Sequence, residues 1–151
     1  MKPLRIVGIF VTLLLAGCLA KGAGTMLAPG QIDVFGVALH SATDYREING
    51  VSGSDEPCLR GYERSFEPLD IVLGYGRDGK IRKITTRNRQ NSMFGVRIGD
   101  VAETARANVR AAGFAENGAP DRFSKDDLTL TFLVDNSGKV FGLTLEVTGP
   151  G

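Results

Sequence analysis

The chain has 151 residues, of which 42% are hydrophobic and 23% are charged, as in an ordinary globular protein. Its 18 Lys and Arg residues nearly balance its 17 Asp and Glu residues, so no global field favours nucleic acid or an acidic substrate. One His and no Trp leave few of the side chains that most often build catalytic and interaction sites. This length predicts one domain, or two very small ones, with a core of modest size.

The first residues predict export. Lys2 and Arg5 precede an apolar run at residues 6–16, which has the length of a signal-peptide core and is too short for a comfortable membrane span. The run ends in Leu15-Ala16-Gly17-Cys18, which resembles a bacterial lipobox. In that motif the Cys is lipidated and becomes the first residue of the mature chain.

This resemblance implies a lipoprotein signal peptide at residues 1–17 and a lipid anchor on Cys18, followed by a flexible tether at residues 18–32. The lipid chains would then hold the protein at the membrane. Leu19 is not the Asp that often signals inner-membrane retention, which favours the outer membrane if the host has one. A secretory signal cleaved near residues 20–24, or an uncleaved anchor, would also place the domain outside the cytoplasm.

The role of the second cysteine depends on this prediction. If Cys18 is lipidated, Cys58 is a lone thiol in an oxidising compartment, either buried or unreactive, or engaged in an intermolecular disulfide. If Cys18 is not lipidated, a Cys18–Cys58 bridge can form.

The two halves of the sequence resemble each other at a constant offset of 59 residues. The matching segments are residues 69–88 with 128–147, Phe35-Gly36-Val37 with Phe94-Gly95-Val96, Ser65 with Ser124, Gly79-Lys80 with Gly138-Lys139, and Thr85 with Thr144. A register that continues without a gap over most of each half is unlike a chance match of two short motifs. We therefore predict two tandem copies, residues 33–89 and residues 92–148.

The first copy predicts a short helix followed by strands. Ser41-x-x-Asp44 is typical of a helix N-terminus, and Tyr45 and Ile48 belong to an apolar stripe about two turns long. The glycine-rich residues 50–54 end this helix early. Alternating apolar residues predict strands near residues 62–66, 69–75 and 81–87.

The second copy has stronger signals. Asp100-x-x-Glu103 is typical of a capping box and predicts a helix from Val101 to about Ala112, ended by Gly113. Residues 122–124 predict a short strand, and strict alternation on both sides of residues 135–138 predicts a hairpin over residues 128–147.

These elements predict an α+β fold, because an isolated hairpin with one small helix is not stable alone. We expect two tandem helix-plus-antiparallel-hairpin repeats that share one core. The antiparallel sheet would have four to six strands, with the helices on one face.

Few residues suggest catalysis. His40 is the only His, and metal sites draw on several ligands at set spacings. We therefore expect no catalytic residues, no metal and no cofactor. An envelope enzyme or enzyme accessory remains as an alternative if folding brings His40, Asp44 and Cys58 together.

Residues 77–97 concentrate positive charge, with seven basic residues and one acidic residue. Lys83, Thr85 and Arg87 fall on one face of a predicted strand. We predict that Lys83, Arg87 and Arg89 bind a partner, which could be an acidic protein, anionic lipid head groups or a cell-wall polymer. The alternative is a solvated outer face of the sheet. Nucleic acid is not expected for an exported protein.

The pattern resembles two groups of exported bacterial proteins. The residues that carry the resemblance are Leu15–Cys18, Phe94-Gly95-Val96 through Gly99-Asp100, Gly113, and Leu128–Val147 around Gly138-Lys139. One group has the beta-lactamase-inhibitor-like fold of two tandem helix-plus-hairpin repeats. The other is the SmpA/BamE-like group of outer-membrane assembly lipoproteins, with one such repeat behind a lipobox.

The resemblance implies a lipid-anchored, non-catalytic protein-interaction or inhibitor-like module of the cell envelope, which presents a sheet face to a partner. A structural envelope spacer is a further alternative, favoured if the other repeat buries the basic strand.

Overall fold

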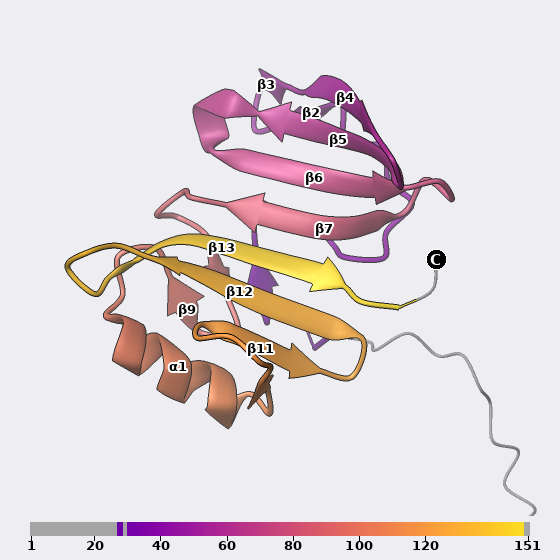
Figure 1. Ribbon diagram of the computed structural model, residues 1–151. Helices are drawn as coiled ribbons and strands as arrows, with labels where there is room; N and C mark the ends of the chain where they lie inside the picture. Colours follow the sequence, from indigo (N-terminus) through magenta and orange to yellow (C-terminus); the bar gives the residue numbers. More distant parts are fainter. Residues whose placement is uncertain (1–26, 29, 150–151) are drawn as a thin grey trace, which may run out of the picture.

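The computed structural model of the protein describes residues 27–28 and 30–149. The predicted signal peptide and Cys18 lie outside these residues. A large antiparallel sheet dominates the fold, with strand order β10-β11-β12-β13-β7-β6-β5-β4 (Figure 1). Its strands are β4 (Ser54–Cys58), β5 (Gly61–Phe66), β6 (Ile71–Gly76), β7 (Ile81–Thr86), β10 (Ala115–Glu116), β11 (Arg122–Lys125), β12 (Leu128–Val134) and β13 (Val140–Val147).

Smaller elements accompany the large sheet. They are β1 (Ile32–Asp33), β8 (Ser92–Met93) and β9 (Val96–Arg97), which form a three-stranded sheet, the pair β2 (Glu47–Ile48) and β3 (Val51–Ser52), the 3-10 turn η1 (Glu67–Leu69) and the helix α1 (Ala102–Ala111). Figure 1 shows the three-stranded sheet behind the large one.

One hydrophobic core lies between these layers. Successive side chains of a strand point to opposite faces, so the strands of the large sheet contribute alternate residues to the core, except for β4 and β10 at its two edges, which contribute none. Leu73, Ile84, Leu130 and Leu145 are fully buried there, in one cluster with side chains of α1 and of the three-stranded sheet. The other face of the large sheet has no element over it among the described residues, and we call it the open face.

An approximate two-fold axis relates the two halves. The central strands β7 and β13 pair antiparallel, and Thr85 lies opposite Thr144 with 3.1 Å between the two hydroxyl oxygens. At another point, Asp33 of β1 lies opposite Ser92 of β8. In each pair the two residues are 59 positions apart in the sequence, so each pair joins equivalent positions of the two halves.

Loop hydrogen bonds recur at the same offset. The N–H of His40 donates to the carbonyl of Ile81 over 2.8 Å, and the N–H of Gly99 donates to the carbonyl of Val140 over 2.7 Å. His40 and Gly99 both have a positive φ, at 64° and 100°. The connection into each hairpin therefore has the same geometry in both halves.

The predicted helix in the first copy is wrong. Residues 47–52 form the small hairpin of β2 and β3 instead, with Ile48 opposite Val51. The turn residues Asn49 and Gly50 have φ values of 50° and 78°, as a two-residue type I′ turn requires. Asn-Gly is the strongest sequence signal for such a turn, and it outweighed a short apolar stripe at helical spacing.

The helix of the second copy is present, but its predicted cap is wrong. A carboxylate oxygen of Asp100 accepts the N–H of Arg97 over 2.8 Å, and Val101 stands at the N-cap position without a side-chain hydrogen bond. The chain leaves the helix at Gly113, with φ at 90°, and its N–H donates to the carbonyl of Arg110 over 2.9 Å.

The predicted α+β fold of two helix-plus-hairpin repeats is therefore wrong. The described chain is mostly β, with one α-helix and a sheet of eight strands rather than four to six. The outermost strands escaped prediction because they do not alternate: every residue of β4 is exposed, and so are both residues of β10. Strands at a sheet edge commonly carry charges and Pro, as Asp55, Glu56 and Pro57 do here.

The offset of 59 also fails at one strand. Phe66 lies opposite Ile71, and Phe123 lies opposite Leu130, so β5 matches β11 at an offset of 57. The chain between Phe123 and Leu130 is two residues longer than the chain between Phe66 and Ile71, which passes through η1. Ser65 and Ser124 are consequently not structural equivalents, although the sequence register suggested it.

Candidate functional site

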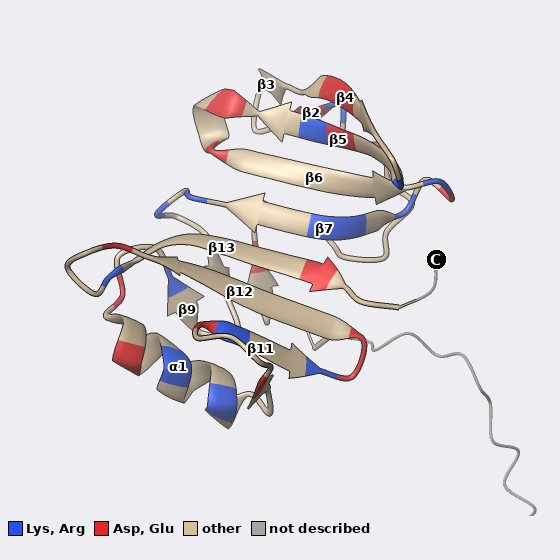
Figure 2. Cartoon of the chain, in the orientation of Figure 1, with Lys and Arg blue, Asp and Glu red and all other residues tan. Residues whose placement is uncertain are grey.

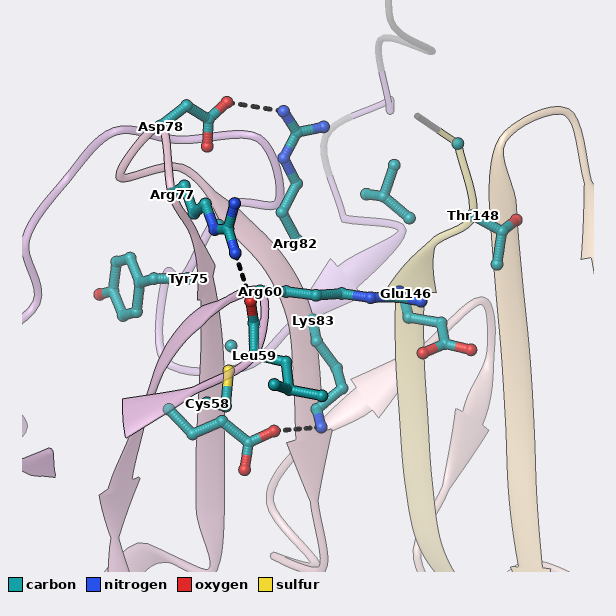
Figure 3. A pocket seen from close by; sticks show the side chains of 15 residues that line it. Cys58, Leu59, Arg60, Tyr75, Arg77, Asp78, Arg82, Lys83, Glu146 and Thr148 are labelled. Atoms are coloured by element: carbon teal, nitrogen blue, oxygen red, sulfur yellow. Dashed lines mark hydrogen bonds and ion pairs between the residues drawn. The ribbon is translucent and has the colours of Figure 1, made fainter. Parts of the chain in front are cut away.

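The open face has a concavity at one end. It lies where the tip of the β4–β5 hairpin, the β6–β7 turn and the end of β13 meet, and its volume is about 1010 Å³ (Figure 3). Of the residues that line it, Cys58, Leu59 and Arg60 come from the first of these segments. Glu146, Val147 and Thr148 come from the last.

Two glycines of β6 allow charged side chains to lie close to the backbone in this concavity. Gly74 and Gly76 of β6 both line it. A Cβ atom on Gly74 would meet Cβ of Lys83 at 2.9 Å, and one on Gly76 would meet a carboxylate oxygen of Asp78 at 2.8 Å. Gly74 therefore lets the Lys83 side chain lie across β6, and Gly76 leaves space for the carboxylate of Asp78.

Gly61 has a different role at the same end of the sheet. Its φ is 151°, and an added Cβ atom would stand 2.1 Å from the carbonyl oxygen of Tyr75. Because the clash is with backbone, no side-chain rearrangement can relieve it. Gly61 thus lets β5 begin close against the end of β6.

Two ion pairs cross the concavity. Arg82 contacts Asp78 over 2.6 Å, and Lys83 of β7 reaches across β6 to contact Glu63 of β5. The hydrogen bond from Arg82 lowers the pKa of the Asp78 carboxyl group, and the backbone N–H of Lys80 adds to this effect. These four charges therefore largely neutralise one another.

Two arginines at the rim are not neutralised in this way. Arg77 donates one hydrogen bond to the carbonyl of Leu59 over 3.0 Å, which ties the β6–β7 turn to the β4–β5 tip. Arg60 has no ion pair or hydrogen bond within the described residues. Figure 3 shows its side chain extending across the concavity toward Glu146.

The thiol of Cys58 is free and exposed within the described chain, so of the options left open by the sequence only a buried thiol is excluded. Cys58 is the last residue of β4, and it precedes the two-residue tip of the hairpin, in which Leu59 is 92% exposed. A proposed bridge to Cys18 falls outside the described residues.

The residues predicted to bind a partner do not form one cluster. Lys83 and Arg87 do lie on the same side of β7 and its extension, as predicted, but Lys83 lies in the concavity. Arg87 lies beyond the other end of β7, with its guanidinium carbon 5.9 Å from the ring centre of Phe141. Arg89 is exposed in the loop that follows. The Lys83 side chain is 33% exposed, so the second copy does not bury the basic strand.

An apolar patch beside Arg87 escaped sequence analysis. Leu133 and Phe141 are 37% and 40% exposed on adjacent strands. Strict alternation along β13 would place Phe141 on the same face as the buried Leu143, but the pairing of β12 with β13 shifts register between Leu133 and Val134. This bulge makes Phe141 the extra residue and buries Val140 instead.

Charge of both signs borders the open face. Figure 2 shows a basic band on β7 and acidic residues at the end of β13 and along β4 and β5. The surface around Lys83 is thus not uniformly basic, because Glu146 lies opposite it on β13 and Glu63 contacts it from β5, beyond β6.

The three residues of the alternative enzyme site have different neighbours. His40 lies with Nε2 3.8 Å from a carboxylate oxygen of Asp127. Asp44 bonds to Arg64, and Cys58 lies in the concavity, whose lining includes neither of the other two. Within the described residues no group of three His, Cys, Asp or Glu side chains is placed to hold a metal ion.

In the part of the chain that the structure describes, no helix has the length and apolar character needed to cross a membrane. Comparison with protein families, with curated proteins and with solved structures finds no match for this chain. The two resemblances drawn from the sequence therefore remain predictions.

Proposed function

We propose that this protein is a lipid-anchored, non-catalytic binding module of the cell envelope, which contacts an acidic partner protein through the open face of its sheet. The anchor is the lipidated Cys18 expected from the lipobox-like Leu15–Cys18. Export through the signal peptide at residues 1–17 would place the domain on the periplasmic side or at the cell surface.

The observation that carries this proposal is the patch of Leu133, Phe141 and Arg87. Most exposed apolar side chains of a soluble domain stand singly, whereas these two are adjacent on the open face with a guanidinium over the aromatic ring. Arg and aromatic residues are enriched where protein interfaces gain most of their binding energy. Arg89 adds a second positive charge in the following loop.

The chemistry of the partner follows from charge. Neither Arg87 nor Arg89 has an acidic partner within the described residues. An acidic surface on the partner would supply the missing counter-charges, speed association and fix orientation. Lys83 would contribute less than its position in the sequence suggests, because Glu63 already pairs with it.

Charge reversal tests the proposal. We expect the full chain with Arg87→Glu and Arg89→Glu to lose most of the protein captured by crosslinking in intact cells. The matched control is Arg97→Glu with Arg110→Glu, which reverses two exposed arginines on β9 and α1 rather than on the large sheet. A single dominant partner that is lost only from the first variant would support the proposal, and capture that is unchanged in both would refute it.

A further inference from the structure

The concavity beside the β4–β5 tip holds an excess of positive charge that the fold itself does not use. Four basic and three acidic side chains line it: Arg60, Arg77, Arg82 and Lys83 against Glu63, Asp78 and Glu146. Arg82 and Lys83 are paired within the site. Arg60 and Arg77 have no acidic partner among the described residues and stand at its rim (Figure 3).

The other half of the molecule shows that these charges are not needed for the hairpin. The β6–β7 and β12–β13 hairpins have the same register, with a bulge at the equivalent positions after Gly74 and after Leu133. At the offset of 59, Arg77, Arg82 and Lys83 correspond to Asn136, Phe141 and Gly142. The same backbone is therefore built with basic residues at these three positions in one half and at none of them in the other.

The side chains that cover the two hairpins can be compared in the same way. In the second half the cross-strand pair is Leu133 with Gly142, so a leucine side chain covers the sheet. In the first half the pair is Gly74 with Lys83, and the lysine extends toward Glu63. The lysine side chain therefore lies over Gly74 as the leucine lies over Gly142, and the first half places a charged group where the second half places an apolar one. A volume of about 1010 Å³ reaches the upper end of the range of roughly 300–1,000 Å³ for small-molecule sites.

We propose that this concavity binds a small molecule that carries a carboxylate or phosphate group, held by the guanidinium groups of Arg60 and Arg77. A guanidinium group presents its N–H donors in a planar fork that matches both anions. Leu59 and Val147 offer apolar contact to the remainder of the ligand. The site does not include Arg87 or Phe141, so it is independent of the partner surface proposed above.

Cys58 provides a reporter inside the site, because its free thiol lines the same concavity. In the full chain with Cys18→Ser it is the only thiol. We would measure its rate of reaction with the anionic disulfide dithiobis(nitrobenzoate) and with the neutral disulfide dithiodipyridine. The rate constant for the anionic reagent divided by that for the neutral reagent reports attraction of the anion, because any change in thiol ionisation affects both reactions alike.

We expect this ratio to fall by about threefold or more when Arg60→Gln and Arg77→Gln are introduced, as loss of two charges near the thiol predicts in water at moderate salt. The matched control, Arg97→Gln with Arg122→Gln, removes two charges outside the concavity and should leave the ratio unchanged. An equal ratio in wild type and in the Arg60→Gln, Arg77→Gln variant would overturn the proposal.

A second measurement identifies the anion. Inorganic phosphate or succinate, added at constant ionic strength, should slow the reaction of Cys58 with the neutral reagent by occupying the site. Protection by phosphate alone assigns a phosphate-bearing ligand, and protection by succinate alone assigns a carboxylate. Protection by both supports an anion site of either kind. Absence of protection by either anion would reject the site, whatever the outcome of partner capture.

Discussion

At the scale of single residues, Arg64 decides the structure of a segment whose sequence suggested a helix. Its side chain is 3% exposed, and it donates to the carbonyl of Tyr45 over 2.9 Å. It also bonds to the carboxylates of Asp44 and Asp55, and its guanidinium carbon lies 5.4 Å and 5.5 Å from the rings of Tyr62 and Tyr75. This network fixes the loop before β2 to the sheet.

The network predicts acid sensitivity. Hydrogen bonds from Arg64 lower the pKa of both Asp44 and Asp55 below the ordinary value of 3.8. A carboxyl group with a lowered folded-state pKa stabilises the fold above its unfolded pKa and loses that contribution as pH falls through the folded pKa. We therefore expect the free energy of unfolding, measured by urea titration, to decrease as the pH is lowered below about 4.

Arg64→Met tests the cause. At neutral pH we expect it to cost about 2–4 kcal/mol, because it removes several charge-assisted hydrogen bonds and leaves two carboxylates that are only partly solvated. Its unfolding free energy should also vary less with pH below about 4 than that of the wild type. Some dependence will remain, since Asp78 and Asp135 also have lowered pKa values. Equal pH dependence in both proteins would contradict this account.

At the scale of elements, tight turns depend on single glycines in two distinct ways. Gly61 combines φ at 151° with a close approach to the carbonyl of Tyr75. Gly79 has φ at 71°, but a Cβ atom there would meet nothing within 4 Å. The same substitution at the two positions therefore separates steric clash from backbone preference.

We expect Gly61→Ala to destabilise the protein by about 2–4 kcal/mol, because backbone must shift where β5 meets β6. Gly79→Ala should cost only about 1 kcal/mol, the penalty for placing a Cβ atom at positive φ. Urea unfolding followed by circular dichroism measures both. Equal losses for the two variants would show that the close approach at Gly61 has no energetic weight.

Elements with strict alternation could be predicted, and elements that depend on one local exception could not. The hairpin over residues 128–147 was confirmed because its core residues alternate for many positions. Phe141 was misplaced by a single bulge, which the sequence does not mark. The predicted first helix is wrong because Asn49-Gly50 forms a type I′ turn, which decides the local structure over the helical spacing of Tyr45 and Ile48.

The same limits apply to the candidate sites. Charge clustering along residues 77–97 located Lys83, Arg87 and Arg89, and alternation placed Lys83 and Arg87 on one side. The sequence could not reveal that Glu63 pairs with Lys83, because that contact depends on strand order. Nor could it reveal that Arg60 lies across from Glu146, since β4 and β5 were not expected to bring the tip at Cys58–Gly61 beside the end of β13.

At the scale of the whole molecule, the two halves complete each other. β7 and β13 are the equivalent strands of the two halves, and they pair with each other at the centre of the sheet. The buried side chains of both halves form one cluster, which also takes in α1 and the three-stranded sheet. Strand β1 of the first half and β8 of the second likewise pair with each other. Neither half therefore has a core or a sheet of its own.

This arrangement predicts that the second half alone, residues 92–149, has no folded monomer. Without the first half, Leu143 and Leu145 lose the neighbouring strand, and β13 becomes an exposed edge that presents unpaired backbone groups. A unit of this size also buries too small a share of its surface to be stable when part of its core is missing. Its one route to a complete sheet is to pair β13 with β13 of a second copy, as Thr85 and Thr144 pair about the axis of the intact chain.

Sedimentation combined with circular dichroism should therefore find an unfolded monomer, or a folded dimer that dissociates and unfolds together on dilution, whereas residues 27–149 should remain a folded monomer. A stable, folded monomer of residues 92–149 would show that the second half is an independent domain and would contradict a core shared by the two halves.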